Sequence, residues 1–269
     1  MNALLQELKR QLRQAWYRRR YYRGQVWPPA VPPQPLGYLP PGFRVRQVAA
    51  TGLRVVDHFV TPEEAKWLIN AAREHLARST VVVDGRSRQD SGRTSANAVV
   101  FHRYAQDPKI LPLLARGAML AGVPPDHAEQ IYVSRYGPGE LYHGHFDTAP
   151  GFLTADRLCT LLVYLNDLEP AQGGATYFRD LRVAVQPRLG RAVCWTNTNP
   201  DGSTHPETAH AALPPHGAGS EKWVAQLWFR PYRMHRIRGR LAPLQAKTGK
   251  PLASHAGLPD GVSTLDDSR

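Results

Sequence analysis

Residues 135–147 read RYGPGELYHGHFD, and this stretch decides the fold class and the chemistry of the chain. It ends with His145 and Asp147, which stand two positions apart in a region of short β-branched and aromatic runs that begins near Glu129. Residues i and i+2 of a β-strand point to the same side of a sheet. The imidazole and the carboxylate can therefore bind the same ion.

A distant histidine would complete a metal site. His205, His210 and His216 compete for this role, and His143 offers a His-x-His pair with the nearby His145 as a further alternative. Two imidazoles and one carboxylate on one face of an ion leave the other positions open, which is typical of non-haem Fe(II) oxygenases. The mixed nitrogen and oxygen set favours Fe(II) over structural zinc.

Further motifs follow in a fixed order along the chain. They are RLCT at 157–160, YLND at 164–167, GGATYF at 173–178, GRAVCW at 190–195, DG at 201–202, HAA at 210–212, EKW at 221–223 and Trp228. This succession resembles the catalytic domain of the prolyl 4-hydroxylases, members of the 2-oxoglutarate- and Fe(II)-dependent dioxygenases. Residues 53–80 and the Arg-Thr-Ser run at 93–95 also fit this family, so the resemblance covers about residues 50–232.

The resemblance implies the roles of the metal ligands and of one lysine. His145, Asp147 and His210 are expected to bind Fe(II), because His210 fits the family's His-Ala-Ala pattern before the lysine. Lys222 is expected to pair with the far carboxylate of 2-oxoglutarate; the alternative is a surface lysine. Dioxygen is the implied co-substrate, and ascorbate is a further expected ligand. The connection at 213–220 is longer than is usual in the family.

The resemblance also implies residues for the co-substrate and for a peptide. Tyr136 and Thr176 are expected to hydrogen-bond the 2-oxoglutarate carboxylate, with a core position as the alternative for the tyrosine. An aromatic patch with a few donors suits a proline-containing peptide in an extended conformation. The residues expected to line this groove are Tyr142, Arg157, Trp228, Arg93 and Ser95. A salt bridge for the arginine at 157 and core packing for the tryptophan are the competing interpretations.

The expected activity is the 4-hydroxylation of prolyl residues in a peptide or protein. The same chemistry on another side chain or on a small molecule is an alternative, because specificity depends on the groove. Oxidative demethylation of nucleic acid is a further one, suggested by the basic ends, although the nucleic-acid branch has arginine where Lys222 stands. The last alternative is a non-enzymatic binding protein whose metal site has no catalytic role.

The charge of the chain lies at its ends. Residues 1–48 carry nine Lys or Arg against one Glu, and residues 233–269 carry seven against three Asp. The whole net charge of +12 therefore belongs to the ends, and residues 49–232 are close to neutral. A basic catalytic body would indicate nucleic acid as the partner, and this body is not basic.

The 269 residues suit one domain with extensions. The expected division is a basic amphipathic helix with a Pro-rich linker at 1–48, the dioxygenase domain at 49–232, and a basic, then disordered tail at 233–269. The apolar residues of the helix over 2–20 recur at helical spacing, and a run RRRYYR follows it, so the helix either packs on the core or contacts an anionic partner. Proline-rich residues 27–42 predict an extended linker.

Two cysteines in apolar runs, Cys159 and Cys194, favour a reducing compartment over a disulfide framework. The sequence lacks an apolar run of about 20 residues and a signal-peptide pattern, so a cytoplasmic location is expected.

The local patterns predict helices before strands. Residues 53–60 read as a strand, and Thr61-Pro62-Glu63-Glu64 predicts a capped helix start. A second helix is expected from 107–108 to near Gly122, and a mobile loop at 87–94. The predicted fold class is α+β, and the resemblance sharpens this to a double-stranded β-helix, or jelly roll, supported by helices.

Overall fold

A computed structural model describes residues 44–48, 53–83, 86–100, 109–148, 157–199, 203–230, 234 and 263–264. The predicted amphipathic helix at 2–20 and the Pro-rich segment at 27–42 lie outside these residues, as does most of the expected tail. Within the described part of the chain, no helix is long and apolar enough to cross a bilayer.

The larger sheet is antiparallel and contains eight strands. Segments that are far apart in the sequence lie next to each other in it, so its register brings distant motifs together. Its strands, in spatial order, are β1 (Arg44–Gln47), β2 (Arg54–Asp57), β12 (Ala192–Thr196), β9 (Cys159–Tyr164), β14 (Lys222–Phe229), β7 (Tyr132–Tyr136), β6 (Ala96–Val99) and β3 (Ala77–Arg78).

The smaller sheet contains five strands and holds most of the metal motif. Its strands, in spatial order, are β15 (Ser263–Thr264), β11 (Val183–Val185), β10 (Thr176–Phe178), β13 (His210–Ala212) and β8 (Tyr142–His145). Among the described strands, only β15, which belongs to the expected tail, pairs in parallel, with β11. The remaining strands, β4 (Val81–Val83) and β5 (Arg86–Arg88), form a separate hairpin. This pair of sheets confirms the predicted jelly roll.

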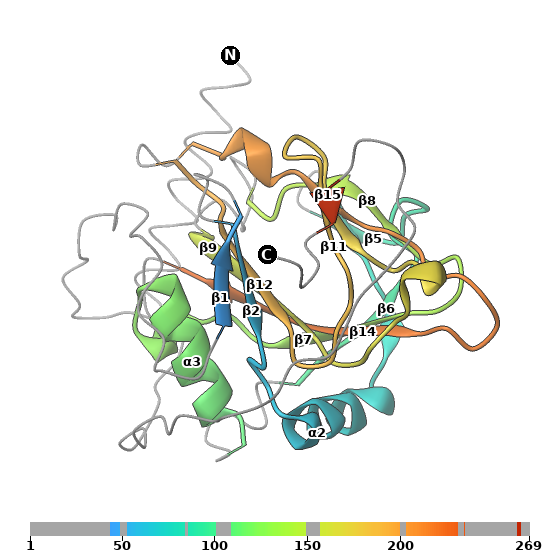
Figure 1. Ribbon diagram of the computed structural model, residues 1–269, viewed down its shortest axis with the longest axis horizontal. Helices are drawn as coiled ribbons and strands as arrows, with labels where there is room; N and C mark the ends of the chain where they lie inside the picture. The colour runs from blue at the N-terminus through green and yellow to red at the C-terminus, as the bar shows by residue number, and fades with distance from the viewer. Residues whose placement is uncertain are drawn as a thin grey trace.

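Alternate residues of the central strands pack into different cores. On β12, Val193 and Trp195 join the cluster between the two sheets, whereas Ala192 and Cys194 join the cluster beneath the helices. Both faces of β12 are therefore buried, as expected for a central strand with period-2 alternation. In Figure 1 the helices α2 (Pro62–Arg73) and α3 (Leu111–Ala121) lie outside the larger sheet, on the side away from the smaller one.

The first helix begins as predicted. Thr61 accepts a hydrogen bond from the backbone of Glu64, and the Glu64 side chain accepts one from the backbone of Thr61. This reciprocal capping box confirms the start of α2. The second helix, α3, begins at Leu111 and ends as expected at Gly122, whose φ of +67° is the left-handed conformation that glycine tolerates.

Two local expectations differ from the structure. Strand β2 stops at Asp57 instead of continuing to residue 60, because His58 adopts a φ of +58° and turns the chain. The expected loop at 87–94 begins inside β5, and Arg93 forms bridges with Asp90 and Tyr142. The start of this segment is a strand because β5 pairs with β4 in a hairpin. The sequence has a signal for this hairpin, since the two residues between the strands are Asp-Gly.

The two cysteines face each other from neighbouring strands. Cys159 begins β9, Cys194 lies in β12, and their Sγ atoms are 3.2 Å apart. Both are free thiols, and both are buried in the core beneath the helices. The side chains that follow them, Thr160 and Trp195, are paired in register and point instead to the space between the sheets.

Candidate active site

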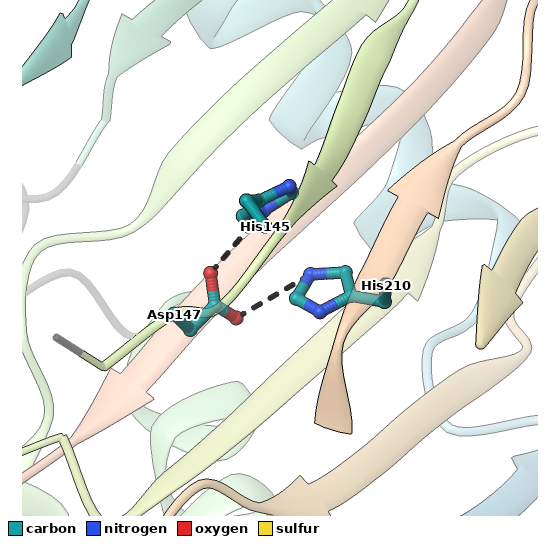
Figure 2. Close-up of side chains that lie close together, drawn as sticks. All are labelled: His145, Asp147 and His210. Carbon is teal, nitrogen blue, oxygen red and sulfur yellow. Dashed lines mark ion pairs between the residues drawn. The ribbon is translucent and has the colours of Figure 1, made fainter. Parts of the chain in front are cut away.

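Three ligand side chains converge between β8 and β13. His145 at the end of β8 is the register partner of His210 at the start of β13, and Asp147 follows β8 by two residues. The Asp147 Oδ1 atom is 3.6 Å from His145 Nε2, and its Oδ2 atom is 3.7 Å from His210 Nε2. Figure 2 shows the carboxylate pointing between the two imidazoles. Ligand atoms of the three residues lie within 4.8 Å of one another, which is close enough to hold one metal ion.

Backbone carbonyls orient both imidazoles. The Nδ1 atom of His145 is 2.8 Å from the His143 carbonyl oxygen, and the Nδ1 atom of His210 is 2.9 Å from the Thr208 carbonyl oxygen. Each Nδ1–H can donate to its carbonyl, which leaves Nε2 free to bind a metal. Burial, together with the neighbouring His145, lowers the pKa of His210 to about 4, so this imidazole is neutral and available as a ligand near neutral pH.

The carboxylate is buried and ionised. Burial opposes its charge, but the two imidazoles and Arg157 outweigh burial and hold the pKa of Asp147 well below its usual range. The Thr160 hydroxyl donates to Asp147 Oδ2 over 2.7 Å, and both side chains are buried. Two imidazole nitrogens and one carboxylate oxygen fit Fe(II) by the chemistry of the donor set.

The competing histidines lie elsewhere. His143 is exposed and contributes its carbonyl, not its ring, to the site. His205 accepts a hydrogen bond from the Glu207 backbone at the start of a short 3-10 helix, Pro206–Thr208. His216 is exposed next to Gly173. Among the described residues, His145, Asp147 and His210 are the group that could hold a metal.

Lys222 is a buried cation. It begins β14 opposite Tyr136 of β7 and is 1% exposed, which excludes the surface lysine of the alternative interpretation. Its Nζ atom lies 5.0 Å from the ring centre of Tyr136 and 5.9 Å from that of Tyr164, and no described side chain or backbone group hydrogen-bonds it. Burial lowers the pKa of Lys222 to about 7. A buried ammonium with this environment calls for an anion.

The two hydroxyl residues predicted beside this lysine are both buried. Tyr136 shares a hydrogen bond with Ser95, and burial raises the pKa of its phenol. The Thr176 Oγ1 atom is 2.7 Å from the hydroxyl of Tyr164, which also lies 2.8 Å from the Val185 carbonyl oxygen. The sequence prediction missed Tyr164, although it is the first residue of the YLND motif.

A buried ion cluster holds Arg157 beside the metal ligands. Its guanidinium donates to both carboxylate oxygens of Glu129, at 2.8 and 2.9 Å, and to the Asp147 carbonyl oxygen at 3.3 Å. Arg230 donates to the same glutamate at 2.7 Å. The guanidinium carbon of Arg157 also lies 3.7 Å from the ring centre of Trp228, which is 7% exposed. The salt bridge considered for this arginine is therefore present, and Glu129 is a partner that the sequence prediction missed.

A second cation–aromatic pair lies against His145. The ring of Tyr142 stacks on its imidazole with centres 3.6 Å apart, and the guanidinium carbon of Arg93 lies 4.5 Å from the Tyr142 ring centre. Ser95, the remaining residue predicted for the groove, is fully buried and hydrogen-bonded to Ser79 at 2.9 Å. Tyr142 is thus the predicted groove residue that directly contacts a metal ligand side chain.

Comparisons with known proteins agree with this geometry. Residues 131–230 match the 2OG-Fe(II) oxygenase superfamily. Prolyl 4-hydroxylase 1 of Arabidopsis thaliana is 30% identical over 195 residues, which are 65% of this chain and 68% of that protein. The human prolyl 4-hydroxylase subunit alpha-3 is 33% identical, and the match covers 65% of this chain but 32% of the subunit.

A solved structure adds the fold. The viral collagen prolyl hydroxylase of Paramecium Bursaria Chlorella virus-1, in complex with 2OG, is 27% identical with a TM-score of 0.50, over 66% of this chain and 95% of that one. Sequence, fold and metal triad agree. The chain belongs to the prolyl 4-hydroxylase family of 2-oxoglutarate- and Fe(II)-dependent dioxygenases.

Proposed function

We propose that this dioxygenase hydroxylates prolyl residues at carbon 4 in a peptide or protein. One atom of dioxygen enters the substrate, the other enters 2-oxoglutarate, and the products are the hydroxylated peptide, succinate and carbon dioxide. His145, Asp147 and His210 would hold the Fe(II). When bound there, the ion supplies the redox chemistry with dioxygen, and the protein supplies placement and the exclusion of water.

Lys222 is the residue we assign to the far carboxylate of 2-oxoglutarate. A dicarboxylate placed there would give the buried ammonium the counter-charge that it lacks among the described residues. A buried charge without a partner is destabilising, so binding of the dicarboxylate is favoured. Thr176 and Tyr164, which are hydrogen-bonded to each other, supply hydroxyls on the same side, because the Tyr164 ring lies beside the ammonium. This arrangement supports the assignment of Lys222, Tyr136 and Thr176 to the co-substrate.

The observation that carries the peptide substrate is the pair of cation–aromatic contacts attached to the metal ligands. Tyr142 stacks on His145, and Arg157, which covers Trp228, donates to the backbone of Asp147. Proline-containing segments in an extended conformation dock on aromatic side chains, because their conformation is preformed and their rings are apolar. Rings fixed to the ligands would place a prolyl ring next to the metal.

Succinate release with a panel of proline-containing peptides tests the proposal. Each peptide has a partner in which the proline is replaced by alanine, and mass spectrometry locates the added oxygen atom. We expect succinate and oxygen insertion with the prolyl peptides only, and neither with the His145→Ala variant. Turnover of oligonucleotides or of a small molecule, with no prolyl peptide accepted, would overturn the proposed substrate but not the family.

Arg157→Gln separates the role of the substrate surface from that of the metal. It should raise KM for the peptide while Fe(II) still binds, because the arginine hydrogen-bonds the backbone but not the carboxylate of Asp147, and both imidazoles remain beside that carboxylate. Arg46→Gln is the matched control, since Arg46 lies on β1 and pairs with Asp57. An unchanged KM in Arg157→Gln would remove this residue from the peptide surface.

A further inference from the structure

A chain of buried hydrogen bonds leads from the metal carboxylate to an asparagine. Asp147 Oδ2 accepts from the Thr160 hydroxyl at 2.7 Å, and Thr160 Oγ1 accepts from the Asn197 side-chain amide at 2.9 Å. Thr160 is 1% exposed and Asn197 is fully buried. Thr160 lies in β9, and Asn197 directly follows the neighbouring strand β12. A residue of the larger sheet, Thr160, therefore hydrogen-bonds the candidate ligand Asp147, which follows a strand of the smaller sheet.

The direction of each proton in this chain is determined by chemistry. A carboxylate that binds a metal is ionised and can only accept, so the Thr160 hydroxyl proton must point at Asp147. The Thr160 oxygen is then left as an acceptor, and Asn197 meets it with its Nδ2–H. An acceptor in place of this amide would compete with Asp147 for the single hydroxyl proton. The donor end of Asn197 thus enforces the hydrogen bond to the carboxylate.

Stability does not account for this asparagine. Its Oδ1 atom is buried, and among the described residues it has no hydrogen-bond partner. A buried acceptor left unsatisfied is destabilising, typically by about 1–3 kcal/mol. An apolar side chain of similar size would avoid this penalty. The role of the amide must therefore lie in its NH2 group, which donates to Thr160.

The backbone of Asn197 is itself fixed, and it reaches a second ligand. Its N–H donates to the Leu158 carbonyl at 2.8 Å, and its carbonyl accepts from the His205 N–H at 2.9 Å. His205 is the N-cap of the short helix that ends at Thr208, and the Thr208 carbonyl accepts from the ring of His210. One residue is therefore connected to the carboxylate through a side chain and to the distal imidazole through the backbone.

We propose that Asn197 and Thr160 form a positioning relay for the metal site. Asn197 holds the Thr160 hydroxyl, and the hydroxyl holds the Asp147 carboxylate in one rotation, so that the three ligands are preorganised before the ion arrives. Partners of this kind change metal affinity or activity by about 10- to 100-fold when they are removed. The relay concerns the metal-binding step and goes beyond the proposed peptide substrate, so either can fail without the other.

The test measures the Fe(II) dissociation constant of the full chain by anaerobic calorimetry, without 2-oxoglutarate or peptide. Thr160→Val removes the hydroxyl at constant shape and should weaken binding about 10- to 100-fold. Thr160→Ser keeps the hydroxyl and should restore wild-type affinity. Asn197→Leu keeps the backbone bonds and should weaken binding, though less than Thr160→Val. Ser134→Ala is the control, because it removes another buried hydroxyl, bonded to Gln226 on the same sheet, and should leave the affinity unchanged.

The double variant distinguishes a relay from two separate contacts. If Asn197 acts through Thr160, then Asn197→Leu has no further effect once Thr160 is Val, and the double variant binds Fe(II) as Thr160→Val does. Weakenings that multiply in the double variant would refute the relay, and so would wild-type affinity in either single variant. Thermal unfolding of the metal-free variants checks folding. If Thr160→Val does not fold, Asn197→Leu is measured in the wild-type and in the Thr160→Ser protein instead. An unchanged Fe(II) affinity in both would refute the proposal.

Discussion

Replacing Lys222 by methionine is expected to stabilise the chain without 2-oxoglutarate and to weaken the binding of 2-oxoglutarate. The two effects share one cause, since the ammonium is buried and no described group hydrogen-bonds it. Methionine keeps the apolar length of the side chain between Tyr136 and Tyr164 but removes the charge. The chain then loses a desolvation penalty, and the co-substrate loses its counter-charge.

The size of the effect follows from the pKa of Lys222. A decrease from 10.5 to about 7 corresponds to about 5 kcal/mol of free energy. The pKa is lower in the folded than in the unfolded chain, so the unfolded chain holds more protons between pH 7 and 10.5, and the stability of the wild type rises with pH in this window. The penalty is complete below about pH 7 and falls to about 2 kcal/mol near pH 9.

Urea unfolding of the metal-free proteins near pH 6 and pH 9 measures this penalty. Lys222→Met should exceed the wild type by about 5 kcal/mol near pH 6 and by about 2 kcal/mol near pH 9. Lys66→Met, on the exposed face of α2, should match the wild type at both values. With the metal already bound to both proteins, added 2-oxoglutarate should stabilise the wild type further but not Lys222→Met.

Two results would refute this reasoning. A Lys222→Met protein that is less stable than the wild type near pH 6 would mean that the folded chain already neutralises the ammonium. Equal affinity of the wild type and Lys222→Met for 2-oxoglutarate would mean that the dicarboxylate binds elsewhere.

Three further changes have expected outcomes. Asp147→Asn should abolish Fe(II) binding in anaerobic calorimetry, because the amide lacks the ligand charge, and tight binding would exclude the site. Glu129→Gln should lower the free energy of unfolding by about 3 kcal/mol near pH 7, since it removes the charge opposite Arg157. Two arginines outweigh burial and lower the pKa of Glu129 to about 2, so this difference should be complete above about pH 4.5 and disappear as the pH falls towards 2 in urea titrations; a constant difference would contradict the ion pair. Gly174→Ala should reduce thermal stability by about 1–3 kcal/mol, because φ is +76° and a Cβ would meet Leu168 Cδ1 at 2.6 Å; an unchanged melting temperature would argue against this turn.

The candidate metal triad could be predicted because two of its three residues lie close together in the sequence. His145 and Asp147 are two residues apart in the sequence, which suggests a shared ion, although the structure places Asp147 in the bend after β8 and not in the strand itself. His210 needed the order of the family's motifs, since His205 and His216 lie close by in the sequence. The structure brings His210 beside His145 by pairing β8 with β13, which supports this choice.

The supporting residues could not be predicted, because their partners are distant in the sequence. Thr160 lies 13 residues from Asp147, and Asn197 lies 37 residues from Thr160. Glu129 bonds Arg157 across 28 residues and Arg230 across 101. These contacts depend on the order and register of the strands, and short polar side chains in apolar runs carry no local sign of them.

The paired thiols on β9 and β12 have a consequence for an enzyme that handles dioxygen. Cys159 directly precedes Thr160, so it sits one residue from a group that bonds a metal ligand. The adjacent Cys194 and burial raise the pKa of Cys159 well above its usual value, and the protonated thiol is a poor target for peroxide and similar oxidants. The Cys159 thiol, one residue from Thr160, is therefore kept in the protonated form, which reacts slowly with such oxidants.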